Sequence, residues 1–109
     1  MKTKFPLFSE VVLLEDITLY NLKRGSVGTV VEHYMGNEQQ EIGYSLEGFD
    51  VPYVTIEVGE SKITSVEQWH KEMEILDKLH RLSLVKLAHL EDYVDHLLSE
   101  ETSDRPKVS

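Results

Sequence analysis

Two groups of imidazole and carboxylate side chains in the second half of the chain have a spacing that is suited to binding a metal ion. The groups are His70, Glu74 and Asp77, and His89, Asp92 and His96. Side chains three and four residues apart share one face of a helix, and imidazole together with carboxylate binds metal ions. A solvated polar helix face shows the same pattern and is far more common. We therefore expect neither a bound metal nor another cofactor.

Other catalytic arrangements find little support in the chain. It has no cysteine, which excludes disulfides, thiolate zinc sites and cysteine nucleophiles and fits a reducing compartment. Serines are scattered, and none lies in a nucleophile-elbow motif. Carboxylates are abundant, but no two are marked by the sequence as facing one cleft. We expect that the protein is not an enzyme.

Two tyrosines and a basic pair are the candidate binding residues. Tyr20 and Tyr53 fall in expected loops or strand edges, where small β-barrels often bind peptides or nucleotides through exposed aromatic rings. Lys23 and Arg24 are adjacent and could contact an acidic ligand. Exposed turn residues would look the same, so both interpretations stay open.

The charge of the chain favours a basic partner. The formal net charge is −9 over 109 residues, with 5 basic and 10 acidic side chains in residues 1–66 and 6 and 10 in residues 67–109. Nucleic-acid affinity comes largely from lysine and arginine, so we do not expect nucleic acid to be the main ligand. A basic protein fits better, because opposite fields speed encounter. Solubility alone is the other explanation of the charge.

No segment has the character of a membrane anchor. The first ten residues lack the apolar run of a signal peptide, and no stretch approaches the roughly 18 apolar residues of a membrane span. We expect a cytoplasmic protein without membrane contacts.

Residues 1–66 are expected to form a small antiparallel β-barrel of the SH3-like type. Short β-branched or alternating runs are separated by turn-forming segments, which is typical of such barrels. The expected strands are Ser9–Glu15, Ser26–Tyr34, Glu41–Phe49, Tyr53–Val58 and Lys62–Val66. We expect Tyr34 and Phe49 to pack in the core.

Two glycines in the segment KRGSVGTVVEHY have a structural explanation. A phosphate-binding loop places its glycines before a helix, but Gly28 is followed by Thr-Val-Val, which favours a strand. A KH-type clamp fails for the same reason. We expect Gly25 to adopt positive φ in a turn and Gly28 to mark a bulge or bend.

Residues 67–101 are expected to be helical, either as one long helix or as two shorter ones. Ser65 and Gln68 have the spacing of a capping box, and Ser83 is suited to cap a second helix from Leu84 to about Ser99. We favour two helices, so the expected fold class is α+β. Residues 102–109 are expected to form a disordered tail.

The second helical segment carries an apolar stripe that requires a partner. Its members are Leu87, Leu90, Val94 and Leu97. We expect a homodimer through the C-terminal helices.

The first half of the chain also resembles a known family. Its usual pattern is Leu-Glu-Asp, then Leu-x-Arg-Gly-x-x-Gly-Thr-Val-Val, then an alternating strand. The matching residues are Leu14, Glu15, Asp16, Leu22, Arg24, Gly25, Gly28, Thr29, Val30 and Val31. The segment of about residues 7–66 is thus similar to the bacterial family called domain of unknown function 4926, which implies an SH3-like barrel and no assigned reaction. The C-terminal helix shows a weaker similarity to helices of small bacterial antitoxins.

The leading hypothesis is a non-catalytic protein-interaction or assembly module, with an antitoxin-like or regulatory role toward a basic protein. The alternative hypothesis is a nucleic-acid-binding SH3-like barrel of the KOW type, because translation and transcription factors use similar Gly-Thr-Val barrels.

Overall fold

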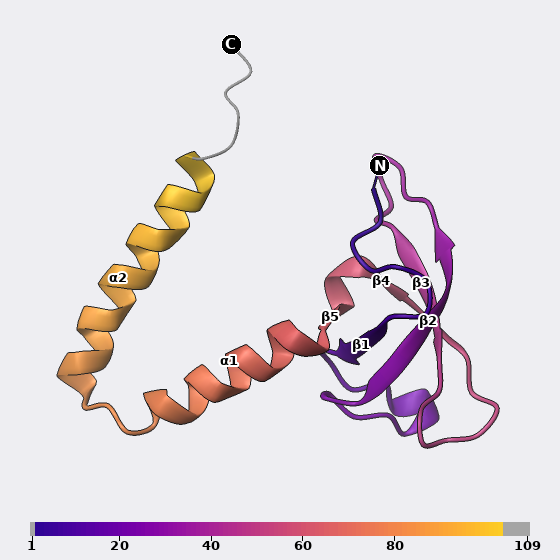
Figure 1. The fold of residues 1–109 in the computed structure, drawn as a ribbon, viewed down its shortest axis with the longest axis horizontal. Coiled ribbons are helices and arrows are strands. Elements are labelled where there is room, and N and C mark those ends of the chain that lie inside the picture. Colours follow the sequence, from indigo (N-terminus) through magenta and orange to yellow (C-terminus); the bar gives the residue numbers. More distant parts are fainter. Residues whose placement is uncertain (1, 104–109) are drawn as a thin grey trace, which may run out of the picture. The chain divides into compact units, whose positions relative to one another are not determined.

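The computed structural model describes residues 2–103 (Figure 1). The chain forms two compact units, the first ending at Glu72 and the second beginning at Met73. The first unit contains a β-sheet and the beginning of a helix, and the second contains the end of that helix and one further helix. The α+β class is therefore confirmed.

Five strands form one antiparallel sheet in the order β4-β3-β2-β1-β5. The strands are β1 (Glu10–Leu13), β2 (Val27–Tyr34), β3 (Gly43–Glu47), β4 (Ile56–Gly59) and β5 (Ile63–Ser65). Two short 3₁₀ turns interrupt the connections, η1 (Thr18–Tyr20) after β1 and η2 (Glu60–Lys62) after β4. Each of the five expected strands overlaps an observed one.

The expected closed barrel needs correction, because the sheet is open. In the described part of the chain, hydrogen-bonded pairing ends at β4 on one edge and at β5 on the other. The reason is local. The η2 turn leads the chain from one edge strand to the other within three residues, and β5 itself has only three residues. The two edge strands therefore never run side by side.

A single hydrophobic core nevertheless joins both edges of the sheet. Ile56 of β4 and Ile63 of β5 belong to the same buried cluster, so the sheet curls around shared apolar side chains. The other members of this core are Phe5, Val11, Leu13, Leu22, Val30, Ile42, Tyr44, Leu46 and Phe49.

Strand β2 contains a bulge that reverses its inward and outward positions. Val30 pairs with Leu46 and Glu32 pairs with Ser45, so Val31 has no partner opposite it. Side chains alternate along a strand, and one extra residue moves all later ones to the other face. His33 consequently points inward, while Tyr34 points outward and is 38% exposed. The expectation that Tyr34 packs in the core was therefore wrong, whereas Phe49 is buried as expected.

The two glycines of the segment KRGSVGTVVEHY, Gly25 and Gly28, have separate roles. Gly25 has φ +94° in the β1–β2 connection, as expected. Gly28 lies within β2 opposite Val11, away from the bulge. A Cβ built on Gly28 would lie only 2.8 Å from Cε1 of Phe49 and closer still to Cζ. The close approach of this ring, and not a bend, is what requires glycine there.

The C-terminal segment forms two helices, α1 (Val66–Leu79) and α2 (Leu84–Ser103). Both expected caps are present: the backbone N–H of Gln68 donates to Ser65 Oγ at 3.0 Å, and that of Lys86 donates to Ser83 Oγ at 3.3 Å. The capping box is incomplete, because the side chain of Gln68 donates instead to Glu72.

Helix α2 extends further than expected, so residues 102–103 of the predicted tail are helical. The rest of that tail, residues 104–109, lies outside the described residues. Neither α1 nor α2, as far as they are described, combines the length and the apolar character needed to cross a lipid bilayer.

Tyr44 of β3 connects three distant parts of the first unit. Its side chain is fully buried and meets the rings of Phe5 and His33 edge to face, with centroids 5.5 and 5.4 Å away. Its hydroxyl donates to Glu60 of η2 and accepts the backbone N–H of Lys4 at 3.0 Å. Burial, followed by the hydrogen bond to Glu60, raises the pKa of Tyr44 above its ordinary value.

The contact between Gly28 and Phe49 is tested by Gly28→Ala. We expect this variant to lose about 1–3 kcal/mol of unfolding free energy, because the buried ring must shift to admit the methyl group. Gly43→Ala is the matched control in the neighbouring strand, since the nearest atom to its Cβ would be 3.6 Å away. It should change stability by less than about 0.5 kcal/mol. Equal urea-unfolding midpoints for the two variants would contradict the packing described.

The raised pKa of Tyr44 predicts a loss of stability in alkali. Below about pH 10 the hydroxyl is protonated in both folded and unfolded chains, so its hydrogen bonds contribute fully. As pH rises through the higher pKa of the folded state, a buried phenolate forms beside Glu60 and this contribution is lost. Tyr44→Phe should therefore be about 1 kcal/mol less stable than wild type at pH 8, and the difference should shrink or reverse above the folded-state pKa.

The free energy of unfolding of the wild type and of Tyr44→Phe is measured by urea unfolding from pH 8 to above the folded-state pKa of Tyr44. Tyr20→Phe is the control at an exposed tyrosine and should follow the wild type throughout. A gap between Tyr44→Phe and wild type that stays constant with pH would contradict the assignment.

Candidate functional site

The outward face of β2, β3 and β4 carries three glutamates and one exposed tyrosine. Glu32, Ser45 and Glu57 pair in line across the three strands. Tyr34 lies two residues beyond Glu32, and Glu47 lies two residues beyond Ser45. We call these five residues, Glu32, Tyr34, Ser45, Glu47 and Glu57, the acidic face.

The local structure explains why these residues meet. The bulge at Val31 directs Glu32 and Tyr34 outward, and regular alternation in β3 and β4 directs the other members to the same side. Three glutamates from different parts of the sequence thereby share one surface.

Hydrogen bonds hold the tyrosine at one end of this face. The Tyr34 hydroxyl lies 3.0 Å from Glu32 Oε2, to which it donates, and 2.8 Å from Ser45 Oγ. Ser45 is only 4% exposed although it lies on the outward side, because the tyrosine covers it. The ring of Tyr34 is thus held in a defined position while one edge remains accessible.

The electrostatics of the face are negative and uncompensated. Within residues 2–101, neither Glu32, Glu47 nor Glu57 forms an ion pair with a basic side chain. The hydrogen bond with Ser45 lowers the pKa of Tyr34, but the bond to Glu32 and the nearby charges of Glu32 and Glu57 outweigh it, so the pKa is raised. A protonated phenol surrounded by carboxylates attracts cations.

A hollow of about 460 Å³ opens at one end of the acidic face. Tyr34, Met35, Glu41, Glu57 and Val58 are among its lining residues. Met35 is 62% exposed, whereas Glu41 is engaged by the backbone N–H of Ser61 at 2.7 Å. The hollow therefore combines an apolar wall with a negative rim, which suits the long aliphatic stem and charged head of lysine or arginine.

The basic pair predicted from the sequence is divided between two environments. The Arg24 guanidinium lies 4.6 Å from the centre of the Trp69 ring, in a cation–π contact. Its backbone N–H donates to Asp16 at 2.7 Å. Lys23 instead lines a hollow of about 400 Å³ together with Asp50. Arg24 therefore has an identifiable structural role in joining the β1–β2 connection to α1.

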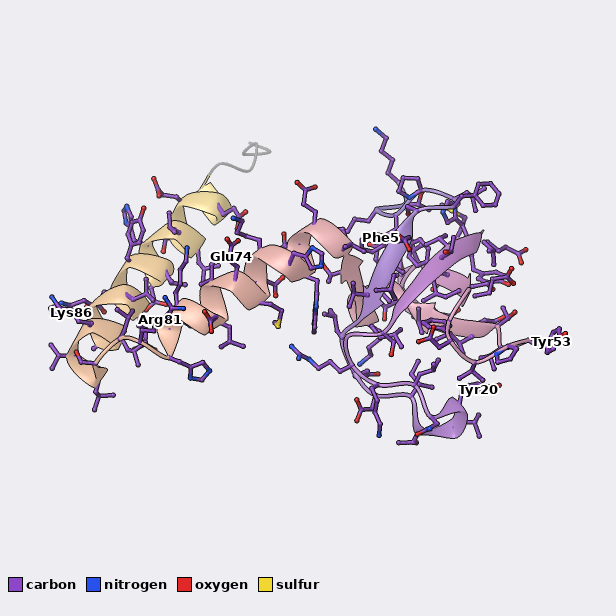
Figure 2. The ribbon with its side chains drawn as sticks, turned by 60° about the horizontal axis from the view of Figure 1, so that its bottom comes forward. Phe5, Tyr20, Tyr53, Glu74, Arg81 and Lys86 are labelled. Atoms are coloured by element: carbon purple, nitrogen blue, oxygen red, sulfur yellow. The ribbon has the colours of Figure 1, made fainter. Side chains whose placement is uncertain are left out.

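The two predicted binding tyrosines are exposed, as Figure 2 shows. Tyr20 ends η1 and is 39% exposed. Tyr53 is fully exposed and has φ +63°, an uncommon conformation for a residue with a side chain. It lines a third hollow, of about 490 Å³, with Phe49 and Val51. Lys23 and Tyr53 thus line different hollows, and Phe49 and Val51 line both of them.

The predicted self-association stripe lies on α2 and is largely accessible. Leu87 and Leu90 are half-buried, while Val94 and Leu97 are 42% and 43% exposed. In the described residues, no three histidine, aspartate or glutamate side chains are grouped so that they could hold a metal ion. This includes both helix faces that have metal-like spacing.

The sequence contained part of the signal for the acidic face. Alternation in the segment YVTIEV places Glu57 on the other face of the strand from Ile56 and Val58. Similar alternation places Ser45 on the other face from Tyr44 and Leu46. The pattern does not give the register between strands, so it does not show which outward residues of different strands lie next to each other. The bulge in β2 determines that register.

Comparison with known proteins finds a family model that matches four of the five strands. No curated protein and no solved structure matched the chain. A family model described as "Domain of unknown function (DUF4926)" matches residues 7–59, slightly less than half of the chain. The match begins before β1 and ends with β4, so β5, α1 and α2 lie outside it. It agrees with the resemblance carried by the Arg-Gly-x-x-Gly-Thr-Val-Val pattern, and residues 7–59 are thus similar to this domain family.

Proposed function

We propose that this chain is a non-catalytic interaction module that binds a basic protein through its acidic face. The observation that carries this proposal is the presence of three carboxylates without ion pairs, Glu32, Glu47 and Glu57, on the same sheet face as the exposed Tyr34. Its partner would present arginine or lysine side chains on one surface.

The chemistry of the face supports binding over catalysis. Tyr34 and Tyr44 both have raised pKa values, so their hydroxyls stay protonated near neutral pH and are poor bases and nucleophiles. Tyrosine is also well suited to interfaces, because its ring offers contact area with little loss of conformational entropy. A guanidinium group approaching Tyr34 would meet an aromatic ring and carboxylates together.

The long-range field of the chain supports the same partner. The net charge of −9 attracts a basic protein and increases the rate of encounter. An antitoxin-like role, in which the partner is a basic toxin, is one specific form of this proposal. Nucleic acid is the alternative ligand, and Lys23 with Arg24 would be its contact.

The proposal is tested by titrating the protein with a short arginine-rich peptide and, separately, with single-stranded RNA and duplex DNA. We expect the peptide to bind at low ionic strength and to weaken as salt is added. Glu32→Gln combined with Glu57→Gln should reduce peptide affinity about three- to tenfold, since both substitutions keep the side-chain shape and remove charge.

The control is Glu67→Gln combined with Asp92→Asn, which removes the same charge from the helices and should leave affinity nearly unchanged. An equal loss in both double variants would show that net charge alone attracts the peptide and would refute a defined site. Binding of RNA or DNA that falls steeply with salt, without peptide binding, would replace this proposal by the nucleic-acid alternative.

A photoreactive phenylalanine at position 34 extends the test to the host cell. We expect it to cross-link to a basic protein, whereas the same group at Tyr20 should not. Cross-linking from position 20 alone would place the interaction on the opposite loops and contradict the acidic face.

A further inference from the structure

Helix α2 is a long helix whose apolar side chains remain largely exposed within the described chain. It comprises 20 residues, which is about 30 Å at about 1.5 Å per residue. From Leu84 to Glu101 none of its side chains is buried. Leu84 is 83% exposed, Tyr93 58% and Leu98 56%. Since most of the stability of a helix in a protein comes from packing of its apolar face and not from the helix alone, the apolar face of α2 requires a partner.

The charges along α2 run against its own dipole. The positive end of a helix dipole is the N-terminus, where acidic residues stabilise the helix. The first turn of α2 contains no acidic residue and the last contains no basic one. Instead, Lys86 lies near the start, with Arg81 just before the helix (Figure 2), and Glu100 and Glu101 lie near the end.

We propose that α2 pairs with α2 of a second copy of this chain, in antiparallel orientation. An antiparallel neighbour brings the acidic end of each helix to the basic end of the other and opposes the two dipoles. A parallel neighbour would place like ends together. For two copies of α2, the positions of Lys86, Glu100 and Glu101 therefore favour the antiparallel direction over the parallel one.

The positions of the apolar residues define the register. The stripe Leu87, Leu90, Val94 and Leu97 has the three-and-four spacing of a coiled-coil seam. In the antiparallel pair, Leu87 meets Leu97 of the second copy and Leu90 meets its Val94. The next position at this spacing is Glu101. A parallel pair would place Glu101 directly against Glu101 of the second copy.

Five of the six residues that flank this seam fit the same register, and the sixth, Glu91, faces Glu91 of the second copy across the two-fold axis. Lys86 lies beside Glu100 of the second copy on one side, and this pair occurs twice by symmetry. On the other side Leu84 lies beside Leu98 of the second copy, so that two strongly exposed leucines cover each other. Tyr93 faces Tyr93 across the two-fold axis. Glu100 also lies 3.7 Å from His96 on its own helix, and Lys86 has no ion pair in the described residues.

Sedimentation equilibrium of the full chain tests the pairing through a charge reversal. We expect a monomer–dimer equilibrium, weakened about tenfold by Lys86→Glu and about equally by Glu100→Lys, because each turns two attractions into repulsions. The double variant should regain most of the affinity. The two single changes alter net charge in opposite directions, so a shared loss cannot come from net charge.

Two controls separate pairing from folding. Both single variants place charges as the helix dipole prefers, so helicity measured by circular dichroism should not fall. Asp92→Lys has the same charge change as Glu100→Lys but lies opposite the seam, and it should dimerise like the wild type.

Because the chain has no cysteine, single cysteines report the orientation. Tyr93→Cys should form a disulfide-linked dimer readily, and Leu87→Cys should not. A monomer at every concentration, failure of the double variant to recover, or efficient cross-linking through Leu87→Cys would each overturn the proposal. The acidic-face variants should dimerise normally, so this inference and the proposed function fail independently.

Discussion

The unpaired residue Val31 in β2 is the constraint on which the rest of the sheet depends. Inward and outward positions alternate strictly along a strand, so one inserted residue exchanges them for everything that follows. After Val31, His33 turns toward Tyr44 in the core, and Glu32 and Tyr34 turn to the surface. Without the bulge, a carboxylate would enter the core and an imidazole would face solvent. Core packing and the acidic face therefore have the same origin.

Tyr44 connects segments of the first unit that surround the core of the open sheet. The edges formed by β4 and β5 are not joined by a hydrogen-bonded ladder, yet they enclose a single core. The buried ring of Tyr44 packs against Phe5 and His33, and its hydroxyl joins the N-terminal segment to η2, which is the β4–β5 connection. The hydrogen bonds of this one hydroxyl thus connect segments that strand pairing does not join. Such a buried network also limits which side chains can occupy position 44.

The two units present surfaces of different character. The sheet offers a negatively charged face with one exposed tyrosine, and β-pairing determines the positions of these side chains. Helix α2 offers an apolar stripe with opposite charges at its two ends. In the proposals made above, the first recognises another protein and the second recognises the same chain. Self-association would then present two copies of the acidic face, which increases the effective affinity for a partner with repeated basic sites.

Local sequence patterns determined the elements of this protein, whereas long-range pairing determined how its faces are composed. Alternating runs predicted the strands, Ser65 and Ser83 predicted the helix starts, and Gly25 predicted a positive φ, because each signal acts within a few residues. The open sheet, the outward position of Tyr34 and the contact of Phe49 with Gly28 were not predicted. These features follow from the register between strands and from ring packing across the core. Strand register and ring packing depend on contacts between segments that are distant in sequence, and no local pattern contains that information.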